Sequence, residues 1–68
     1  MQNLGKEIEK RRKSLSVSQA DLSEMSGVSL RTICAIENGR ANPTIDVLSK
    51  IAEPLGLRIA LLERVIHE

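Results

Sequence analysis

The chain has 68 residues, a formal net charge of +1 at pH 7, and no Phe, Trp or Tyr. A chain this short forms one small domain that buries only about 60% of its unfolded surface, so an aliphatic core and association with a second copy are expected. The absence of aromatic rings argues against stacking on single-stranded nucleic acid, and the single cysteine, Cys34, excludes an internal disulfide and a thiol-rich zinc site.

The first predicted helix covers residues 3–14. Leu4 and Ile8 lie one turn apart on an apolar stripe that continues to Arg12, and Asn3 can cap the helix. Residues 1–14 contain five Lys or Arg and two Glu, a local net charge of +3, whereas the rest of the chain sums to −2. This helix is therefore basic, although its run of basic residues is too short to indicate a nucleic-acid patch.

Two further helices follow, separated by one tight turn. Ser18 caps the first of them, with Asp21 three residues later in a shortened capping box, and Gly27 ends it in a left-handed turn. Ser29 caps the next helix, predicted over residues 30–38. Helices joined this tightly must cross, which is the geometry of a DNA-reading helix-turn-helix. Their expected apolar residues are Ala20, Leu22, Met25, Val28, Ile33 and Ile36.

A loop and a fourth helix come next. Pro43 disfavours helical geometry at Asn42, which places Asn42 in the loop. Thr44 caps the fourth helix, which should end or kink near Glu53 because Pro54 cannot occupy a helix interior without cost. The apolar residues at helical spacing here are Ile45, Leu48, Ile51, Ala52 and Leu55.

Residues 57–61 alternate large apolar side chains with polar or small ones, the period of a half-buried strand. A helical interpretation, with Leu57, Leu61 and Val65 one turn apart, also fits, but we favour the strand. A lone strand in a helical domain has no sheet to join, so pairing with the same strand of a second copy is expected. Leu57, Ile59 and Leu61 would then be dimerisation residues.

Three segments closely resemble the Cro/repressor (Xre) helix-turn-helix family: residues 15–22, 27–33 and 36–44, with sequences LSVSQADL, GVSLRTI and IENGRANPT. The resemblance covers residues 4–57. It implies an all-α, lambda-repressor-like bundle of four or five helices that binds operator DNA as a homodimer. Residues 1–56 would form the DNA-binding part and residues 57–68 a dimerisation segment of the same domain.

The C-terminal part of the sequence has a second, more specific resemblance. Residues 55–61, with the sequence LGLRIAL, look like the corresponding segment of short antitoxin-like regulators, whose C-terminal strands pair across a dimer. Two positions depart from the family: Ser16 stands where glycine is usual, and Pro54 where a helix former is usual. The first departure implies a small local cost, and the second affects the end of the fourth helix and with it the dimer geometry.

The third helix carries the residues expected to read bases. On a helical wheel Arg31 and Ala35 lie opposite the apolar positions, and an inserted helix reads bases through its N-terminal residues. Arg31 is therefore the leading base reader, suited to guanine O6 and N7, with a solvated surface arginine as the alternative. The predicted base-reading set is Arg31, Leu30, Thr32 and Ala35.

Phosphate contacts are expected at both ends of the helix pair. Gln19 begins the second helix, and the resemblance gives the corresponding glutamine a phosphate contact. Asn38 and Arg40 flank the glycine that ends the third helix, although Asn38 also fits a plain helix cap and Ser29 is mainly an N-cap. The predicted phosphate-binding set is Gln19, Ser29, Asn38, Arg40 and Asn42.

Arg12 and Glu37 present a separate problem, because each places a charge on an apolar stripe. Glu37 follows Ile33 by one turn, as Arg12 follows Ile8. Buried charges need partners, so the simplest interpretation is an ion pair between the first and third helices. The family resemblance supports this pairing, whose role would be structural; the alternative is two separate surface charges.

No enzymatic site is predicted. Cys34, on the flank of the third helix, is expected to be a small half-buried hydrophobe, and His67 has no catalytic or metal-binding neighbour. No metal or other cofactor is implied. With no signal-like N-terminus and no long apolar run, the protein is expected to be cytoplasmic, with no membrane partner.

The expected function is that of a transcriptional regulator, most simply a repressor, bound to double-stranded operator DNA. The main alternative is an antitoxin that binds a protein toxin and regulates its own operon, which the short length and the C-terminal segment suggest. A remoter alternative is a protein-interaction module without DNA binding, against which the joint presence of Gln19, Arg31 and Arg40 argues.

Overall fold

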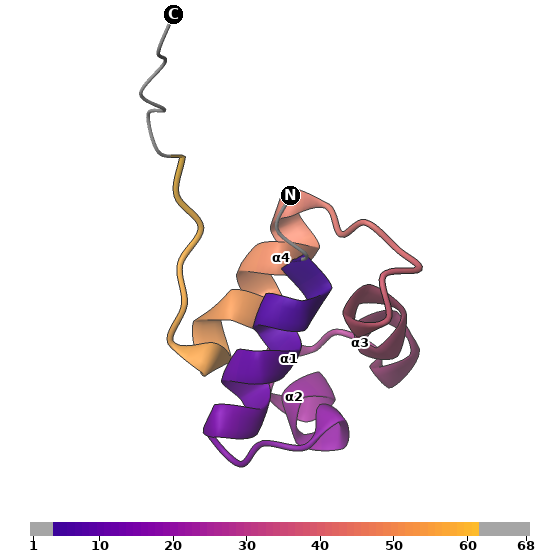
Figure 1. The fold of residues 1–68 in the computed structure, drawn as a ribbon, viewed down its shortest axis with the longest axis vertical. Coiled ribbons are helices and arrows are strands. Elements are labelled where there is room, and N and C mark those ends of the chain that lie inside the picture. The colour runs from indigo at the N-terminus through magenta and orange to yellow at the C-terminus, as the bar shows by residue number, and fades with distance from the viewer. Residues whose placement is uncertain (1–3, 62–68) are drawn as a thin grey trace, which may run out of the picture.

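The computed structural model describes residues 4–61, and that part of the chain holds four α-helices, one short 3₁₀-helix and no strand (Figure 1). The predicted all-α bundle is confirmed. The first and third helices begin and end within one residue of their predicted bounds, whereas the predicted cap Asn3 lies outside the described residues. The elements are α1 (Leu4–Ser14), α2 (Gln19–Ser26), α3 (Leu30–Glu37), α4 (Ile45–Ala52) and η1 (Glu53–Leu55).

Hydroxyl caps fix where three of these helices begin. Ser18 Oγ accepts a hydrogen bond of 2.9 Å from the Asp21 backbone N–H, and the Asp21 carboxylate accepts one from the Ser18 N–H, which completes the capping box. Ser29 and Thr44 cap α3 and α4 with the same type of bond. These caps satisfy backbone donors that a helix cannot pair internally, so they mark the helix starts already visible in the sequence.

The core is small and aliphatic. It is formed by Ile8, Leu22, Val28, Ile33, Ile36, Ile51 and Leu55, with Val17, Val47 and Leu48 packed against it. The predicted apolar stripes extend too far, however. Ile45 is 73% exposed and Met25 is 54% exposed, and Ala20 and Leu4 are also on the surface. These four residues lie in the first or last turn of their helices, at the edge of a core this small.

Pro54 has the predicted effect, because α4 ends at Ala52 and the chain continues in the 3₁₀ turn of η1. Gly56 then adopts a left-handed conformation with φ +68°. Arg11 closes this end of the bundle, since its Nε donates a 2.9 Å hydrogen bond to the Leu55 carbonyl oxygen. The point at which the chain leaves the bundle is therefore fixed from α1.

The segment after Gly56 runs away from the bundle as neither helix nor strand over residues 57–61 (Figure 1). The helical interpretation is not observed for these residues, and Val65, on which it also depended, lies outside the described part. Ile59 is 40% exposed and Leu61 is fully exposed. Pairing of this segment as a strand needs a second copy, so it stays a prediction.

Arg12 and Glu37 meet inside the bundle. Arg12 Nε donates to Glu37 Oε2 at 2.8 Å and Arg12 Nη2 donates to Oε1 at 3.0 Å, while Nη1 donates to the Val17 carbonyl oxygen at 2.9 Å. Arg12 is 7% exposed and Glu37 is 2% exposed. One buried guanidinium thus joins α1, α3 and the connection that leads into α2.

The charge state of this pair follows from its contacts. Burial alone raises the pKa of Glu37, but hydrogen bonds from Arg12 and Gln19, together with the positive charge of Arg12, lower it below its usual value. The hydrogen bond to Glu37 in turn raises the pKa of Arg12. Both groups are therefore ionised at neutral pH, and the pair is a true ion pair.

A second constraint between α1 and α3 involves backbone. Gly5 is buried, and a methyl group added to it would overlap the carbonyl oxygen of Ile36 and lie 3.1 Å from the Glu37 Cα. Glycine at this position lets α1 approach the last turn of α3 without a side chain between them. The sequence signal for such packing is an isolated glycine inside a helical pattern, and Gly5 is one.

Removing either partner of the buried pair should destabilise the fold. Arg12→Met or Glu37→Leu leaves one charge buried without its partner, with an expected loss of about 3–5 kcal/mol in the free energy of unfolding. The double variant removes both charges and should be more stable than either single one. Urea denaturation of all four proteins gives these values. Single variants as stable as the parent chain would contradict a structural role for the pair.

Gly5→Ala should also destabilise the protein, by about 1–3 kcal/mol, because the added methyl group meets unyielding backbone. On helix propensity alone the same change would stabilise an exposed helix by about 1 kcal/mol, so the sign distinguishes the two effects. Lys10→Ala, at an exposed position of α1, serves as the control and should change stability by less than about 0.5 kcal/mol. Thermal unfolding monitored by circular dichroism measures both.

Candidate nucleic-acid interface

The turn between α2 and α3 is held by hydrogen bonds on both sides. Gly27 has φ +75°, which lets the chain reverse at the end of α2. Ser23 Oγ donates to the Val28 carbonyl oxygen at 2.6 Å, and Ser26 Oγ accepts from the Val28 N–H at 3.1 Å. Val28 itself is buried. The turn thereby sets the direction in which α3 begins.

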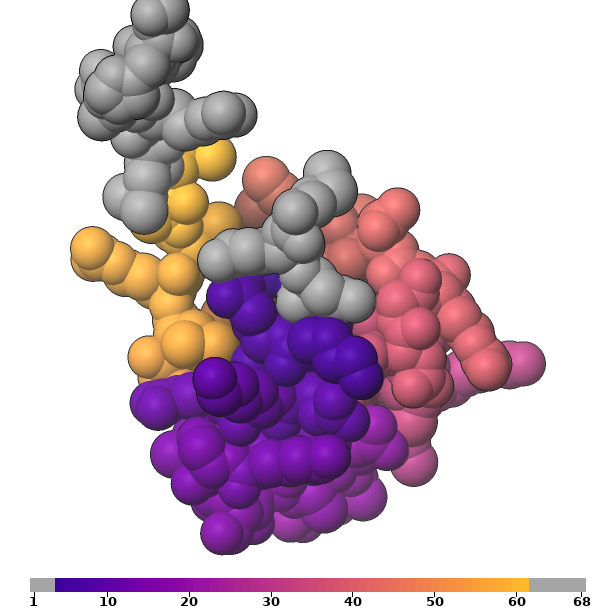
Figure 2. All heavy atoms as spheres, in the orientation of Figure 1, coloured from indigo at the N-terminus to yellow at the C-terminus, as the bar shows by residue number. Residues whose placement is uncertain are grey.

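α3 buries one face and exposes the other. Ile33 and Ile36 belong to the core, whereas Arg31 is exposed and Leu30 is 45% exposed. Thr32 and Ala35, the other predicted base readers, are half-buried. Figure 2 shows α3 and the loop that follows it along one side of the molecule, with residues 57–61 on the opposite side. The surface of α3 is thus open to a large ligand.

The two hydroxyls in the first turn of α3 have different remaining capacities. Ser29 Oγ accepts from the Thr32 backbone N–H and donates its only hydrogen to Thr32 Oγ1 at 2.8 Å. The Ser29 hydroxyl is therefore used inside the helix cap, which is the structural role expected for it. Thr32 keeps its own O–H hydrogen and can donate it to an acceptor outside the protein.

Gln19 takes part in contacts that the sequence did not predict. Its Nε2 donates to Glu37 Oε1 at 3.0 Å, and its Oε1 accepts from the Cys34 thiol at 3.2 Å. Cys34 is half-buried, as expected, but it also donates a hydrogen bond. No periodicity in the sequence relates a residue at the start of α2 to two residues of α3, so only the crossing of the helices could reveal this arrangement.

The remaining predicted phosphate ligands follow α3. Asn38 is its C-cap residue, and Gly39 takes a left-handed conformation with φ +73°. The Arg40 N–H then donates to the Ala35 carbonyl oxygen at 2.8 Å, which holds the turn close to the helix. The side chains of Asn38, Arg40 and Asn42 are all exposed. The predicted phosphate ligands thus come from two places: Gln19 from the start of α2, and the other three from the end of α3 and the loop after it.

Four of the five basic side chains of α1 make contacts within the protein. Lys13 Nζ lies 3.5 Å from a Glu9 carboxylate oxygen, and Lys6 Nζ lies 3.7 Å from the other. Arg11 and Arg12 are held by the contacts described above. Positive charge available to an anionic partner therefore includes Arg31 and Arg40, both exposed, beside and after α3.

Residues 4–61 hold neither a metal-ligand cluster nor a membrane-spanning helix. No group of three or more His, Cys, Asp or Glu side chains is arranged there to hold a metal ion. None of the helices there combines the length and the apolar character needed to cross a membrane. His67 lies outside the described residues.

Comparison with known proteins agrees with this geometry. A family model described as helix-turn-helix matches residues 8–62. An HTH-type transcriptional regulator of Haemophilus influenzae is 37% identical over 57 residues, which cover 84% of this chain and 58% of the relative. One from Methanothermobacter thermautotrophicus is 41% identical over 49 residues, covering 72% of this chain and 71% of the relative.

A third relative, an HTH-type transcriptional regulatory protein of Methanocaldococcus jannaschii, is 38% identical over 68 residues, which cover 94% of this chain but 21% of the relative. The chain thus spans little more than half of the first relative and a fifth of the third. The matched region contains α2, the turn, α3 and the loop that follows. The chain belongs to the helix-turn-helix family of the Cro/repressor (Xre) type.

Proposed function

We propose that the chain binds double-stranded operator DNA in a sequence-specific manner and acts as a homodimeric transcriptional repressor. The observation that carries this proposal is α3, which is anchored by Ile33 and Ile36 and presents exposed Arg31 in its first turn. The relatives' description as transcriptional regulators supports it. A rigidly held helix with an exposed N-terminal arginine suits insertion into the major groove.

The side chains of α3 divide the reading of bases. Arg31 can donate two hydrogen bonds to guanine O6 and N7, a contact worth roughly 1–3 kcal/mol of discrimination. Leu30 can pack on a thymine methyl group, and the free hydroxyl hydrogen of Thr32 can reach an acceptor on a base or a phosphate. Ala35, which has a short side chain, allows the helix to approach the groove closely.

Phosphate contacts would fix the protein on the duplex without reading sequence. Gln19 at the start of α2 and the exposed side chains of Asn38, Arg40 and Asn42 are the proposed ligands. Ser29, whose hydroxyl is occupied, contributes by fixing the first turn of α3. These contacts would bind the DNA backbone on both sides of the groove that α3 enters.

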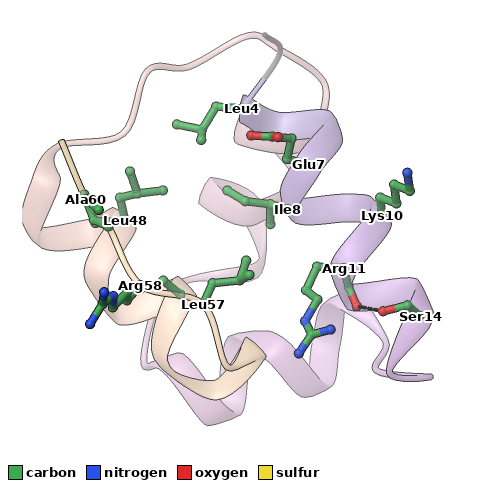
Figure 3. A pocket seen from close by; sticks show the side chains of 12 residues that line it. Leu4, Glu7, Ile8, Lys10, Arg11, Ser14, Leu48, Leu57, Arg58 and Ala60 are labelled. Atoms are coloured by element: carbon green, nitrogen blue, oxygen red, sulfur yellow. Dashed lines mark hydrogen bonds between the residues drawn. The ribbon is translucent and has the colours of Figure 1, made fainter. Parts of the chain in front are cut away.

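The dimer is proposed to form through residues 57–61. A mainly apolar groove of about 510 Å³ lies between α1, α4 and this segment. Figure 3 shows Leu4, Ile8, Leu48 and Leu57 around it. The exposed side chains of Ile59 and Leu61 continue this apolar surface. Because the segment lies opposite α3, pairing there leaves both recognition helices free. Two helices in successive major grooves would read half-sites about 34 Å apart.

Arg31→Ala should flatten base preference at one position of each half-site. Arg40→Ala should instead weaken binding to all sequences alike and reduce the salt dependence of affinity, because it removes a phosphate contact. Selection from random duplexes, followed by affinity measurements on the selected and a scrambled site at several salt concentrations, checks both. An equal loss on specific and scrambled DNA for Arg31→Ala would contradict its role as base reader.

Leu61→Asp should shift the protein from dimer to monomer, because it places a charge on the proposed pairing surface. Its fold should be unchanged, since Leu61 is fully exposed. Ala41→Asp, which adds the same charge at an exposed position of the loop after α3, away from this segment, is the matched control and should stay dimeric. Sedimentation equilibrium measures the assembly. A Leu61→Asp variant that remains dimeric would show that the copies associate elsewhere.

A further inference from the structure

We propose that Cys34 is a positioning residue for DNA binding, which acts by holding the Gln19 amide against Glu37 so that one amide N–H is kept available for a DNA phosphate. This inference rests on the proposed function. Cys34 itself need not touch DNA, because its effect passes through Gln19. It is based on the hydrogen bonds that converge on Gln19 from two positions of α3.

The hydrogen bonds of the Gln19 amide show which of its donors remains for a ligand. A glutamine amide has two N–H donors and one carbonyl oxygen. Glu37 Oε1 accepts one N–H at 3.0 Å, and the carbonyl oxygen accepts the Cys34 thiol at 3.2 Å. The second N–H is the donor these contacts leave for a ligand. With both ends of the amide engaged, its orientation is set before any ligand arrives.

The two holding groups act differently. The Glu37 carboxylate can only accept, so it requires the NH₂ end of the Gln19 amide to face it. Glu37 is itself fixed by Arg12, with hydrogen bonds of 2.8 and 3.0 Å. Cys34 supplies the second point of attachment, at the oxygen end, and two points of attachment restrict rotation of the amide. The Cys34 thiol thus completes a chain of hydrogen bonds through α1, α3 and α2.

Restricting Gln19 in advance matters because ordering a long side chain opposes binding. An immobilised glutamine already in place does not lose this freedom when it meets a phosphate. Loss of one attachment point would return part of that freedom. The expected effect of removing the thiol is a loss of DNA affinity of about threefold to tenfold, from the typical cost of ordering one such side chain.

The test is a double-mutant cycle on the selected operator duplex. Cys34→Ala should weaken binding about threefold to tenfold, whereas Cys34→Ser, which keeps a donor at this position, should retain most of the affinity. In a Gln19→Ala background, Cys34→Ala should have no further effect, because the amide that it positions is gone. Cys34→Val, which also lacks a donor but leaves no cavity, is a second variant if the alanine variant unfolds.

Thermal unfolding of each variant separates stability from binding, and all affinities are measured well below the lowest melting temperature. Cys34→Ala and Cys34→Val variants that bind as tightly as the parent chain overturn the inference. So does an equal loss from Cys34→Ala with and without Gln19. Failure of the proposed function is distinguishable, since the parent chain would then select no duplex sequence at all.

Discussion

The buried ion pair between Arg12 and Glu37 is the interaction on which the arrangement of the helices depends. The aliphatic core supplies most of the stabilisation, but hydrophobic burial has no preferred direction, so the contacts of its seven buried residues define the rotation of α3 only loosely. A guanidinium and a carboxylate joined by two hydrogen bonds do have a preferred geometry. The pair therefore fixes the orientation of α3 that its buried residues Ile33 and Ile36 already favour.

Under the proposed function, the pair also links the scaffold to the DNA-binding surface. Glu37 Oε1 accepts from both Arg12 and Gln19, so one carboxylate oxygen serves the scaffold and the surface at once. The backbone contact at Gly5 reaches the same last turn of α3 from the other end of α1. Anchoring is thus concentrated near Glu37, while Arg31 lies more than one turn away at the exposed end of the helix.

The fold was predictable because its signals are local. Ser18, Ser29 and Thr44 cap helices through hydrogen bonds from backbone N–H groups three residues later. Pro54 ends α4 because proline does not fit a helix interior. The pairing of Arg12 with Glu37 could also be predicted, since each charge interrupts an apolar stripe. The contact of Cys34 with Gln19 could not, because it depends on the crossing of helices. The isolated glycine at position 5 signals close packing but does not say which element packs against it. Ile45 and Met25 were misplaced because a pattern shows which face is apolar, not where the core ends.

The contact at Gly5 has a consequence for how this protein adapts to a ligand. Backbone atoms that lie this close cannot rearrange as side chains do, so a shift of the last turn of α3 toward α1 is sterically opposed. α3 therefore has little room to tilt relative to the rest of the bundle. Under the proposed function, conformational adjustment falls to the duplex, and base pairs that the protein never touches would influence affinity through how easily they bend or twist.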